Sequence, residues 1–227
     1  MTNDDSAFAA VGALSDPVRR RLYRYVAAQP DDVGRDAAAE AVGVSRSLAA
    51  FHLDKLVEAG LLVASSRRLS GRTGPGAGRP AKVYRRGDGE HAVSLPPRSY
   101  DSVGHLLAST VENAGLDREL QEAARAAGAA QPDVAADDLV DALSERGYQP
   151  YWDEETLRLR NCPFHALAEE FPALICGMNL ALLEGIAPAP WSPVMDARPG
   201  ECCVALCRSS GQDAARDPGQ ASKTNER

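Results

Sequence analysis

Five cysteines and one histidine in the second half of this 227-residue chain are the residues whose types and positions best suit chemistry. Cys162 precedes a proline, Cys176 lies in an apolar segment, and Cys202 and Cys203 follow a Pro-Gly pair. His165 stands three residues after Cys162. Thiolates are soft ligands that suit zinc and iron–sulfur clusters. These residues therefore predict a metal site whose ligands come from separate segments.

The spacing of the cysteines also allows a simpler interpretation. No C-x-x-C pair is present, so spacing alone is a weak metal signal. Cysteine is often buried as a small hydrophobe, and Cys176 shares a helical phase with two leucines. Adjacent residues on a strand point to opposite faces, so Cys202 and Cys203 would diverge and the five thiols would not all reach one site. Cys207 is the weakest candidate ligand.

The elements that would position these cysteines form an expected small α+β domain. Its helices and strands are predicted from the spacing of apolar residues, from the alternation of apolar and polar residues, and from turns that contain glycine or proline. The expected order is a helix at 136–146, strands at 148–153 and 156–160, a helix at 172–184 ended by Gly185, and strands at 194–197 and 202–207.

The first half of the chain has a different signature, centred on residues 42–62 (VGVSRSLAAFHLDKLVEAGLL). Ser45 can cap a helix, Gly43 suits a tight turn before it, and Gly60 suits the left-handed residue that ends it. This pattern predicts the turn and recognition helix of a helix-turn-helix. The expected apolar stripe of the helix comprises Leu48, His52 and Leu56, with Leu53 and Val57 beside it.

Side chains on this helix are the expected DNA contacts. Arg46 and Ser47 are the best candidates for base edges, and Ala50 could contact a thymine methyl group. Lys55 is expected at a phosphate. The full expected set on the helix is Ser45, Arg46, Ser47, Ala50, His52 and Lys55.

A hairpin is expected after this helix, with strands at 61–65 and 79–86 and a glycine-rich tip at 69–78. Residues 67–86 contain seven basic and no acidic residues. A basic run can be a solvated loop, but beside a helix-turn-helix it predicts a wing that contacts phosphates or a minor groove. The expected contacts here are Arg68, Arg72, Arg79, Lys82 and Arg85.

Charge divides the chain in two. The net charge is −7, yet the first 100 residues carry 15 Lys/Arg against 11 Asp/Glu, and the rest carry 10 against 21. A DNA-binding domain joined to an acidic module is expected. No apolar run spans a bilayer and the N-terminus lacks a signal-peptide pattern, so we expect a cytoplasmic protein with reduced thiols and no membrane association.

Two capped helices are expected before the recognition helix, at 17–28 and 34–42, and one long helix at 100–127 that Gly115 could interrupt. This long helix could form a dimer interface or pack against its own chain. The expected domains are a winged helix-turn-helix at 1–89, a linker and dimerisation helix at 90–130, an α+β sensor domain at 131–208, and a disordered tail at 209–227.

The chain resembles a known family in both halves. The segments SDPVRRRLY, GVSRSLAAFHLDKLVEAGLL and GRPAKVYRR are similar to ArsR-like winged-helix regulators. The segments NCPFH, PALICGMNLALLEG and PGECCV resemble the iron–sulfur-sensing branch typified by the repressor of the Suf cluster-assembly operon. The resemblance covers roughly residues 8–208.

The resemblance implies a homodimer that binds a palindromic operator in double-stranded DNA. It also implies an iron–sulfur cluster on each subunit, held by three cysteines and a variable fourth ligand. Cys162, Cys176 and one of Cys202 or Cys203 occupy the motif positions, and the fourth ligand is left open. The expected function is therefore a transcriptional repressor controlled by a cluster.

Two other hypotheses remain. The same regulator could use zinc or a thiol-redox switch instead of a cluster. An enzyme with Cys162 as nucleophile and His165 as base is the alternative from another class. The sequence has no clear third catalytic group and no phosphate-binding loop, so we expect a regulator and not an enzyme.

Overall fold

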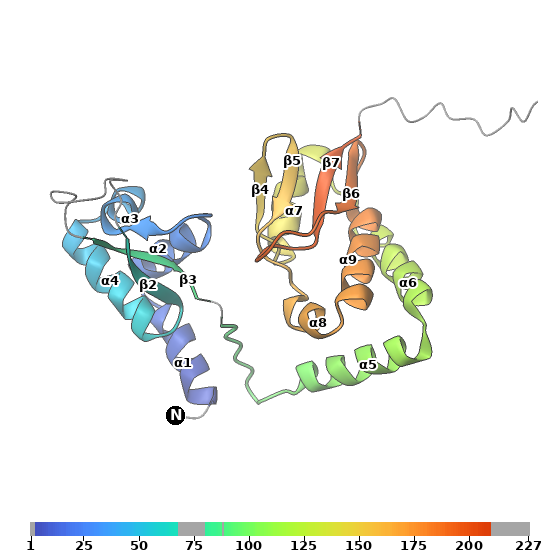
Figure 1. Ribbon diagram of the computed structural model, residues 1–227, viewed down its shortest axis with the longest axis horizontal. Helices are drawn as coiled ribbons and strands as arrows, with labels where there is room; N and C mark the ends of the chain where they lie inside the picture. Colours follow the sequence, from blue (N-terminus) through green and yellow to red (C-terminus); the bar gives the residue numbers. More distant parts are fainter. Residues whose placement is uncertain (1–2, 68–79, 88, 210–227) are drawn as a thin grey trace, which may run out of the picture. The chain divides into compact units, whose positions relative to one another are not determined.

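The computed structural model describes residues 3–67, 80–87 and 89–209, and the chain divides into two compact units, Met1–Arg98 and Ser99–Arg227 (Figure 1). No helix of the described residues is long and apolar enough to cross a membrane. The first unit contains α1 (Asn3–Ala13), α2 (Pro17–Ala27), β1 (Val33–Gly34), α3 (Arg35–Val42), α4 (Arg46–Glu58), β2 (Leu62–Arg67) and β3 (Ala81–Arg86).

Caps set the ends of the helices in the first unit. Asp16 begins α2, because its Oδ1 accepts hydrogen bonds of 2.9 Å from the backbone nitrogens of Val18 and Arg19. Helix α1 was not expected from the sequence. It buries only alanines, Ala10 among them, and alanines give a weak hydrophobic pattern.

The helix-turn-helix forms as the sequence predicts. Gly43 has φ +70° between α3 and α4, and Gly60 has φ +75° after α4, so both adopt the left-handed conformation that favours glycine. Ser45 Oγ accepts a hydrogen bond of 3.3 Å from the backbone nitrogen of Leu48 and caps α4. The predictions for Gly43, Ser45 and Gly60 are confirmed.

The buried stripe of α4 differs from the expected one. Ala49, His52, Leu53 and Leu56 are buried, whereas Leu48 is 40% exposed. Ala49 takes the place of Leu48 in the buried stripe, whereas His52, Leu53 and Leu56 are buried as expected. His52 is therefore a core residue of the first unit.

A three-stranded sheet of order β1-β3-β2 completes the first unit. Strands β2 and β3 are antiparallel, with Ala64 opposite Tyr84. They form the base of the expected wing, whose tip lies outside the described residues. The short strand β1 pairs Val33 with Tyr84 and was not expected.

The second unit contains two helices where one long helix was expected. Gly115 has φ +66° and separates α5 (Tyr100–Ala114) from α6 (Asp117–Ala129). The remaining elements are η1 (Ala136–Asp138), α7 (Leu139–Glu145), β4 (Pro150–Asp153), β5 (Thr156–Leu159), α8 (His165–Glu170), α9 (Pro172–Ile186), β6 (Trp191–Met195) and β7 (Val204–Arg208).

Helix α9 does not end at Gly185, as the sequence analysis expected. Gly185 lies inside the helix and faces α6, the helix beside α9 in Figure 1. A Cβ at Gly185 would stand 2.3 Å from the backbone oxygen of Arg125 and 3.0 Å from the Cα of Gly128. This glycine is therefore needed for close helix packing and not for termination.

The second unit has an antiparallel sheet of order β4-β5-β7-β6. Leu157 of β5 pairs with Leu206 of β7, and both are buried in one cluster with Leu143 of α7 and Leu183 of α9. The same cluster contains Cys202, and Cys162 and Cys203 pack against it. The cysteines thus lie at the edge of the hydrophobic core.

Candidate cofactor site and nucleic-acid interface

The N-terminal end of α4 presents exposed polar side chains. Ser45, Arg46 and Ser47 are exposed, and Ala50 is half-buried. Arg46 Nε lies 2.5 Å from Asp36 Oδ1 of α3, an ion pair that fixes the guanidinium near the start of the helix. This surface can meet base edges in a groove.

Two hydrophobic side chains on α4 lie on the surface, which the sequence analysis did not predict. Phe51 is 56% exposed and Leu48 is 40% exposed, so both can make apolar contacts beside Ala50. His52, in contrast, is 7% exposed, so it does not reach a base edge in this conformation. Lys55 is partly exposed and lies 2.6 Å from Glu58, as a surface cation able to reach a phosphate.

A polar network joins α3, α4 and β3 beside this surface. Asp54 Oδ1 accepts hydrogen bonds of 2.7 Å from both Lys82 Nζ and the Tyr84 hydroxyl. Arg35 Nε donates to the Tyr84 hydroxyl at 2.9 Å. Burial, with the hydrogen bond to Asp54, raises the pKa of Tyr84 to about 12, so its proton stays in place. The network carries one more positive than negative charge, and sequence reasoning missed Arg35 because it follows no basic run.

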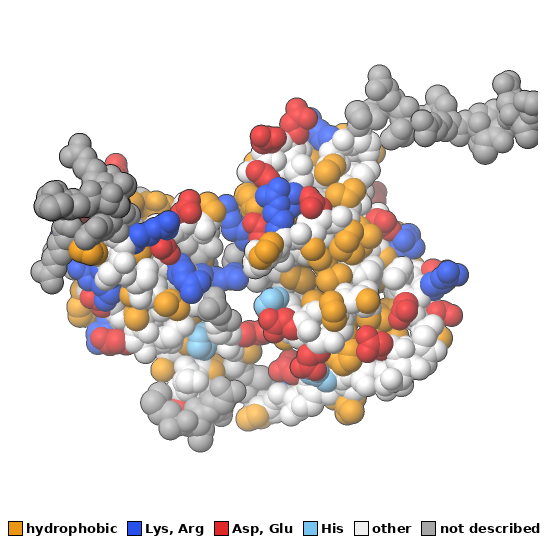
Figure 2. Space-filling model, in the orientation of Figure 1, with side chains coloured by type: hydrophobic (Ala, Val, Ile, Leu, Met, Phe, Trp, Pro, Cys, Tyr) orange, Lys and Arg blue, Asp and Glu red, His pale blue; other side chains and the backbone are white. Residues whose placement is uncertain are grey.

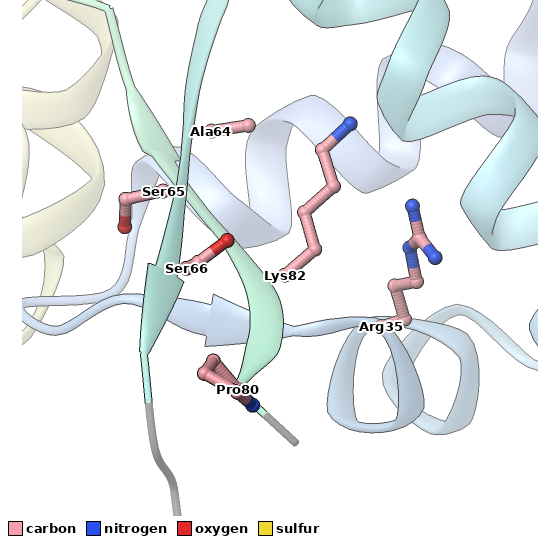
Figure 3. A pocket seen from close by; sticks show the side chains of 6 residues that line it. All are labelled: Arg35, Ala64, Ser65, Ser66, Pro80 and Lys82. Carbon is pink, nitrogen blue, oxygen red and sulfur yellow. The ribbon is translucent and has the colours of Figure 1, made fainter.

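A cavity of about 490 Å³ adjoins this network (Figure 3). The side chains of Arg35 and Lys82 extend to the same side of the hairpin, whereas Ser65 and Ser66 point to opposite sides (Figure 3). Such a basic, polar hollow suits an anion. Its lining residues are Arg35, Ala64, Ser65, Ser66, Pro80 and Lys82.

The wing residues expected at DNA are described only in part. Lys82 and Arg85 lie on β3, where Arg85 is exposed. Arg68, Arg72 and Arg79 lie outside the described residues. On the face seen in Figure 2, Lys and Arg side chains of the first unit lie among Asp and Glu side chains, so the described surface is mixed in charge.

Four of the five cysteines meet in the second unit. The Cys202 thiol interacts with the thiols of Cys162 and Cys203, and Cys203 interacts in turn with Cys176. The four residues come from the segment after β5, the first half of α9 and the turn before β7. Cys202 is buried and the other three are half-buried. The structure thus brings together all four cysteines that the sequence analysis named.

Contact between the thiols makes their ionisation interdependent. A hydrogen bond from the Cys162 thiol, with another from Cys203, lowers the pKa of Cys202. The same contact raises the pKa values of Cys162 and Cys203, because each thiol then lies against the Cys202 sulfur and is partly buried. The group therefore favours one thiolate, centred on Cys202, over several.

The expected divergence of Cys202 and Cys203 is wrong. Strand β7 begins only at Val204, and the two cysteines lie in the irregular segment before it, where strand alternation does not apply. The backbone nitrogen of Cys202 donates to the backbone oxygen of Leu159 at 2.9 Å, which ties this turn to β5. Both thiols can therefore face the same group.

The other two candidates lie elsewhere. His165 is exposed, and its Nε2 is 3.4 Å from Glu169 Oε1 on the same short helix. The Cys207 sulfur contacts Thr156 Oγ1 at 4.0 Å, on the sheet face opposite to Leu206. Neither contact connects these side chains to the four-thiol group.

A charged network holds the loop that leads to Cys202. Arg158 is 5% exposed, although the alternating pattern of β5 placed it on the solvent face. It forms ion pairs with Asp153 at 3.0 Å and with Asp196. Arg198 adds a contact of 2.9 Å to Asp153. The loop between β6 and β7 therefore covers this face of the sheet, which a strand pattern does not reveal.

The four thiols form a series of neighbours and are not yet arranged around a common point. Among the described residues, no three His, Cys, Asp or Glu side chains are placed to hold a single metal ion. Their chemistry nevertheless fits a soft metal centre: four sulfurs from three segments, at the border of a hydrophobic core, with a side-chain amide hydrogen bond to one of them.

Comparison with known protein families supports the identification of a helix-turn-helix domain in the first unit. A family model for a helix-turn-helix domain matches residues 14–63, which span α2, α3, α4 and the start of β2. Searches of curated proteins and of solved structures gave no significant match. The helix-turn-helix domain supports a DNA-binding transcriptional regulator.

Proposed function

We propose that this protein is a transcriptional repressor whose operator binding is controlled by a cysteine-ligated iron–sulfur cluster. The observation that carries the proposal is the meeting of Cys162, Cys176, Cys202 and Cys203 on a chain that also contains a helix-turn-helix domain. Cysteine thiolates are the ligands that hold iron–sulfur clusters in proteins. The protein acts in this proposal as a regulator and not as an enzyme.

The DNA-reading surface in this proposal is α4 with the wing. Arg46 and Ser47 contact base edges, Ala50 contacts a thymine methyl group, and Lys55 and Lys82 contact phosphates. The exposure of Ser45 to Ser47 and the position of Lys82 at a basic cavity support these roles.

The cofactor site in this proposal uses Cys162, Cys176 and the adjacent pair. When bound, a cluster would supply sensitivity to oxidants and to iron supply. The chain's own part is to tie three segments together through their sulfurs. Helix α9 packs closely along α6 at Gly185, so in this proposal a shift of α9 at Cys176 would be passed on to α6.

The regulator is proposed to act as a homodimer on a palindromic operator. Helix α5 has exposed Val103, Leu106 and Leu107, at 52%, 70% and 62%, which is the surface expected of an interface. Two recognition helices must match half-sites about 34 Å apart. A displacement of α6 that alters the pairing of α5 helices would change this spacing.

The decisive experiment is DNA binding by protein isolated anaerobically, before and after removal of its metal. A brown protein with iron and sulfide is expected, and its operator affinity should change at least tenfold on removal. Cys162→Ala and Cys176→Ala should remove this response while DNA binding itself persists. Equal affinity with and without the metal would contradict the proposal. A colourless protein with stoichiometric zinc would favour the zinc switch instead.

A further inference from the structure

A buried chain of hydrogen bonds ends on one of the four sulfurs. The Tyr148 hydroxyl donates to Asn179 Oδ1 at 2.5 Å, and Asn179 Nδ2 donates to Cys202 Sγ at 3.3 Å. The exposed fractions are 3% for Tyr148, 0% for Asn179 and 3% for Cys202. Polar groups buried to this extent destabilise a fold unless each is hydrogen-bonded. The positions of these three side chains are therefore tightly constrained by their hydrogen bonds.

Three elements bring these residues together. Asn179 stands three residues after Cys176 on α9, so it lies on the same side of the helix as the thiol group. Tyr148 follows α7 through Gly147, whose φ of +87° turns the backbone back toward the core. Burial raises the pKa of Tyr148, and the nearby Cys202, Cys162 and Cys203 raise it further.

The direction of the hydrogen bonds suits a sulfur that acts as an acceptor. A sulfur bound to a metal can only accept a hydrogen bond, so the amide nitrogen of Asn179 must face it. The amide oxygen then faces Tyr148 and accepts its hydroxyl proton, and all three groups are satisfied. With the amide reversed, the tyrosine proton would need another acceptor, and Asn179 is its one hydrogen-bond partner among the described residues.

Cys203 lies in a different environment. It is half-buried, and its thiol contacts are with the sulfurs of Cys202 and Cys176. In the described part of the chain, no side-chain amide or hydroxyl group donates a hydrogen bond to its sulfur. The adjacent cysteines therefore differ in the one feature that stabilises a metal-bound sulfur, a fixed N–H donor.

We propose that Cys202, and not Cys203, is the metal-ligating sulfur of the pair, and that Asn179, oriented by Tyr148, is the positioning residue that hydrogen-bonds it. This inference rests on the proposed function and assigns the ligand that the motif leaves open. A hydrogen bond to a ligand sulfur stabilises the more negative, reduced state of a cluster, so the donor raises its reduction potential.

The ligand assignment is tested with two matched variants of the full-length protein. Cys202→Ala and Cys203→Ala are purified anaerobically, and iron, labile sulfide, zinc and visible absorbance are measured. Cys202→Ala should lose most of the metal, and Cys203→Ala should keep most of it. The reverse result, or equal losses in both, would overturn the assignment.

The positioning role is tested by the reduction potential of the loaded protein. Asn179→Leu should lower the midpoint potential and speed metal loss to a chelator severalfold. Tyr148→Phe should have the same effects to a smaller degree, and should add nothing in the Asn179→Leu background. Tyr84→Phe removes another buried tyrosine hydroxyl, in the first unit, and should leave the potential unchanged. Thermal unfolding of each variant identifies those that fail to fold.

The results of these experiments distinguish a failure of this inference from a failure of the proposed function. If the wild-type protein takes up neither a cluster nor zinc, the proposed function fails, and the ligand assignment fails with it. If the wild type is loaded but folded Asn179→Leu and Tyr148→Phe proteins keep its potential, only the inference fails. For a zinc-loaded protein, the rate of zinc loss to a chelator replaces the potential, and the same order of variants is expected.

Discussion

In the proposed DNA-binding surface, single side chains on α4 divide into those that would read sequence and those that would add affinity. Arg46 is exposed at the start of the helix and can form two hydrogen bonds to a guanine edge. We expect Arg46→Ala to reduce discrimination between operator and mutant sites by about 1–3 kcal/mol. The measurement is a set of binding titrations with single-base variants of the operator.

The control for that prediction is a cation expected to contact phosphate. Lys55→Gln should weaken binding to all sequences alike and reduce the salt dependence of binding by about one ion. An Arg46→Ala protein that lost affinity equally for every sequence would show that Arg46 is also a phosphate contact.

Asp54 makes the first unit sensitive to acid. Partial burial raises the pKa of Asp54, but hydrogen bonds from Lys82 and Tyr84 outweigh it, so the pKa lies below its ordinary 3.8. A group of this kind stabilises the fold fully above its unfolded pKa and loses that effect as the pH falls through its folded pKa. We therefore expect the free energy of unfolding to fall below about pH 4, and Asp54→Asn to make that fall shallower.

Urea unfolding at several pH values measures this effect, and Glu40→Gln, at an exposed position of α3, is the matched control. The Asp54→Asn protein should be less stable than the wild type at pH 7, because the carboxylate that accepts the Tyr84 and Lys82 hydrogen bonds is lost. Parallel pH profiles for the wild type and Asp54→Asn would contradict the prediction.

The candidate cysteine site could be predicted better from the types of its residues than from their spacing in the sequence. The four cysteines could be named from the sequence because few other side chains are soft ligands. The partners of Cys202 could not, since Tyr148 and Asn179 are 31 positions apart and Tyr148 belongs to no motif. The burial of His52 could not be decided from the sequence, because a histidine on an apolar stripe can be surface or core, and tertiary packing decides which.

At the scale of elements, local signals predicted the first unit well. Caps and left-handed glycines are decided by a few neighbouring residues, and those at Asp16, Gly43, Ser45 and Gly60 are confirmed. Helices α1 and α8 were missed, because one is alanine-rich and the other is a six-residue helix directly before Pro172. Gly185 was read as a helix end, because the sequence cannot show that α6 lies against it.

The close packing of α9 against α6 predicts that a larger residue at Gly185 destabilises the second unit. Alanine at Gly185 would place a Cβ 2.3 Å from a backbone oxygen of α6, which neither backbone can relieve without moving. Overpacking of this severity costs about 3 kcal/mol, and alanine regains about 1 kcal/mol in helix propensity. We expect Gly185→Ala to destabilise the second unit by about 2 kcal/mol in denaturant unfolding.

Gly104→Ala in α5 is the matched control for Gly185→Ala. A Cβ at Gly104 would meet only the Leu167 side chain, at 3.6 Å, which is an ordinary contact. The helix propensity term then acts alone, so this variant should be slightly more stable than the wild type. Equal destabilisation by both substitutions would mean that the glycines act through the backbone and not through helix packing.

At the scale of the whole molecule, the proposed homodimer depends on α5. Its outer side carries Tyr100, Val103, Leu106 and Leu107, all more than half exposed, while Ala108 faces the second unit and is buried. An apolar helix face of this kind would be poorly solvated in a monomer. The proposed homodimer covers it with the same face of a second chain, which is the self-complementary contact of a twofold dimer.

A charge placed on that face should therefore separate the subunits. We expect Leu106→Glu with Leu107→Glu to give a monomer in analytical ultracentrifugation. Operator affinity should fall by about 100-fold or more, because the second half-site then binds without the benefit of effective concentration. Binding to a single half-site should be unchanged, since α4 is untouched. Glu112→Lys, on the opposite side of α5 by helical periodicity, should remain dimeric, and a dimeric double variant would locate the interface elsewhere.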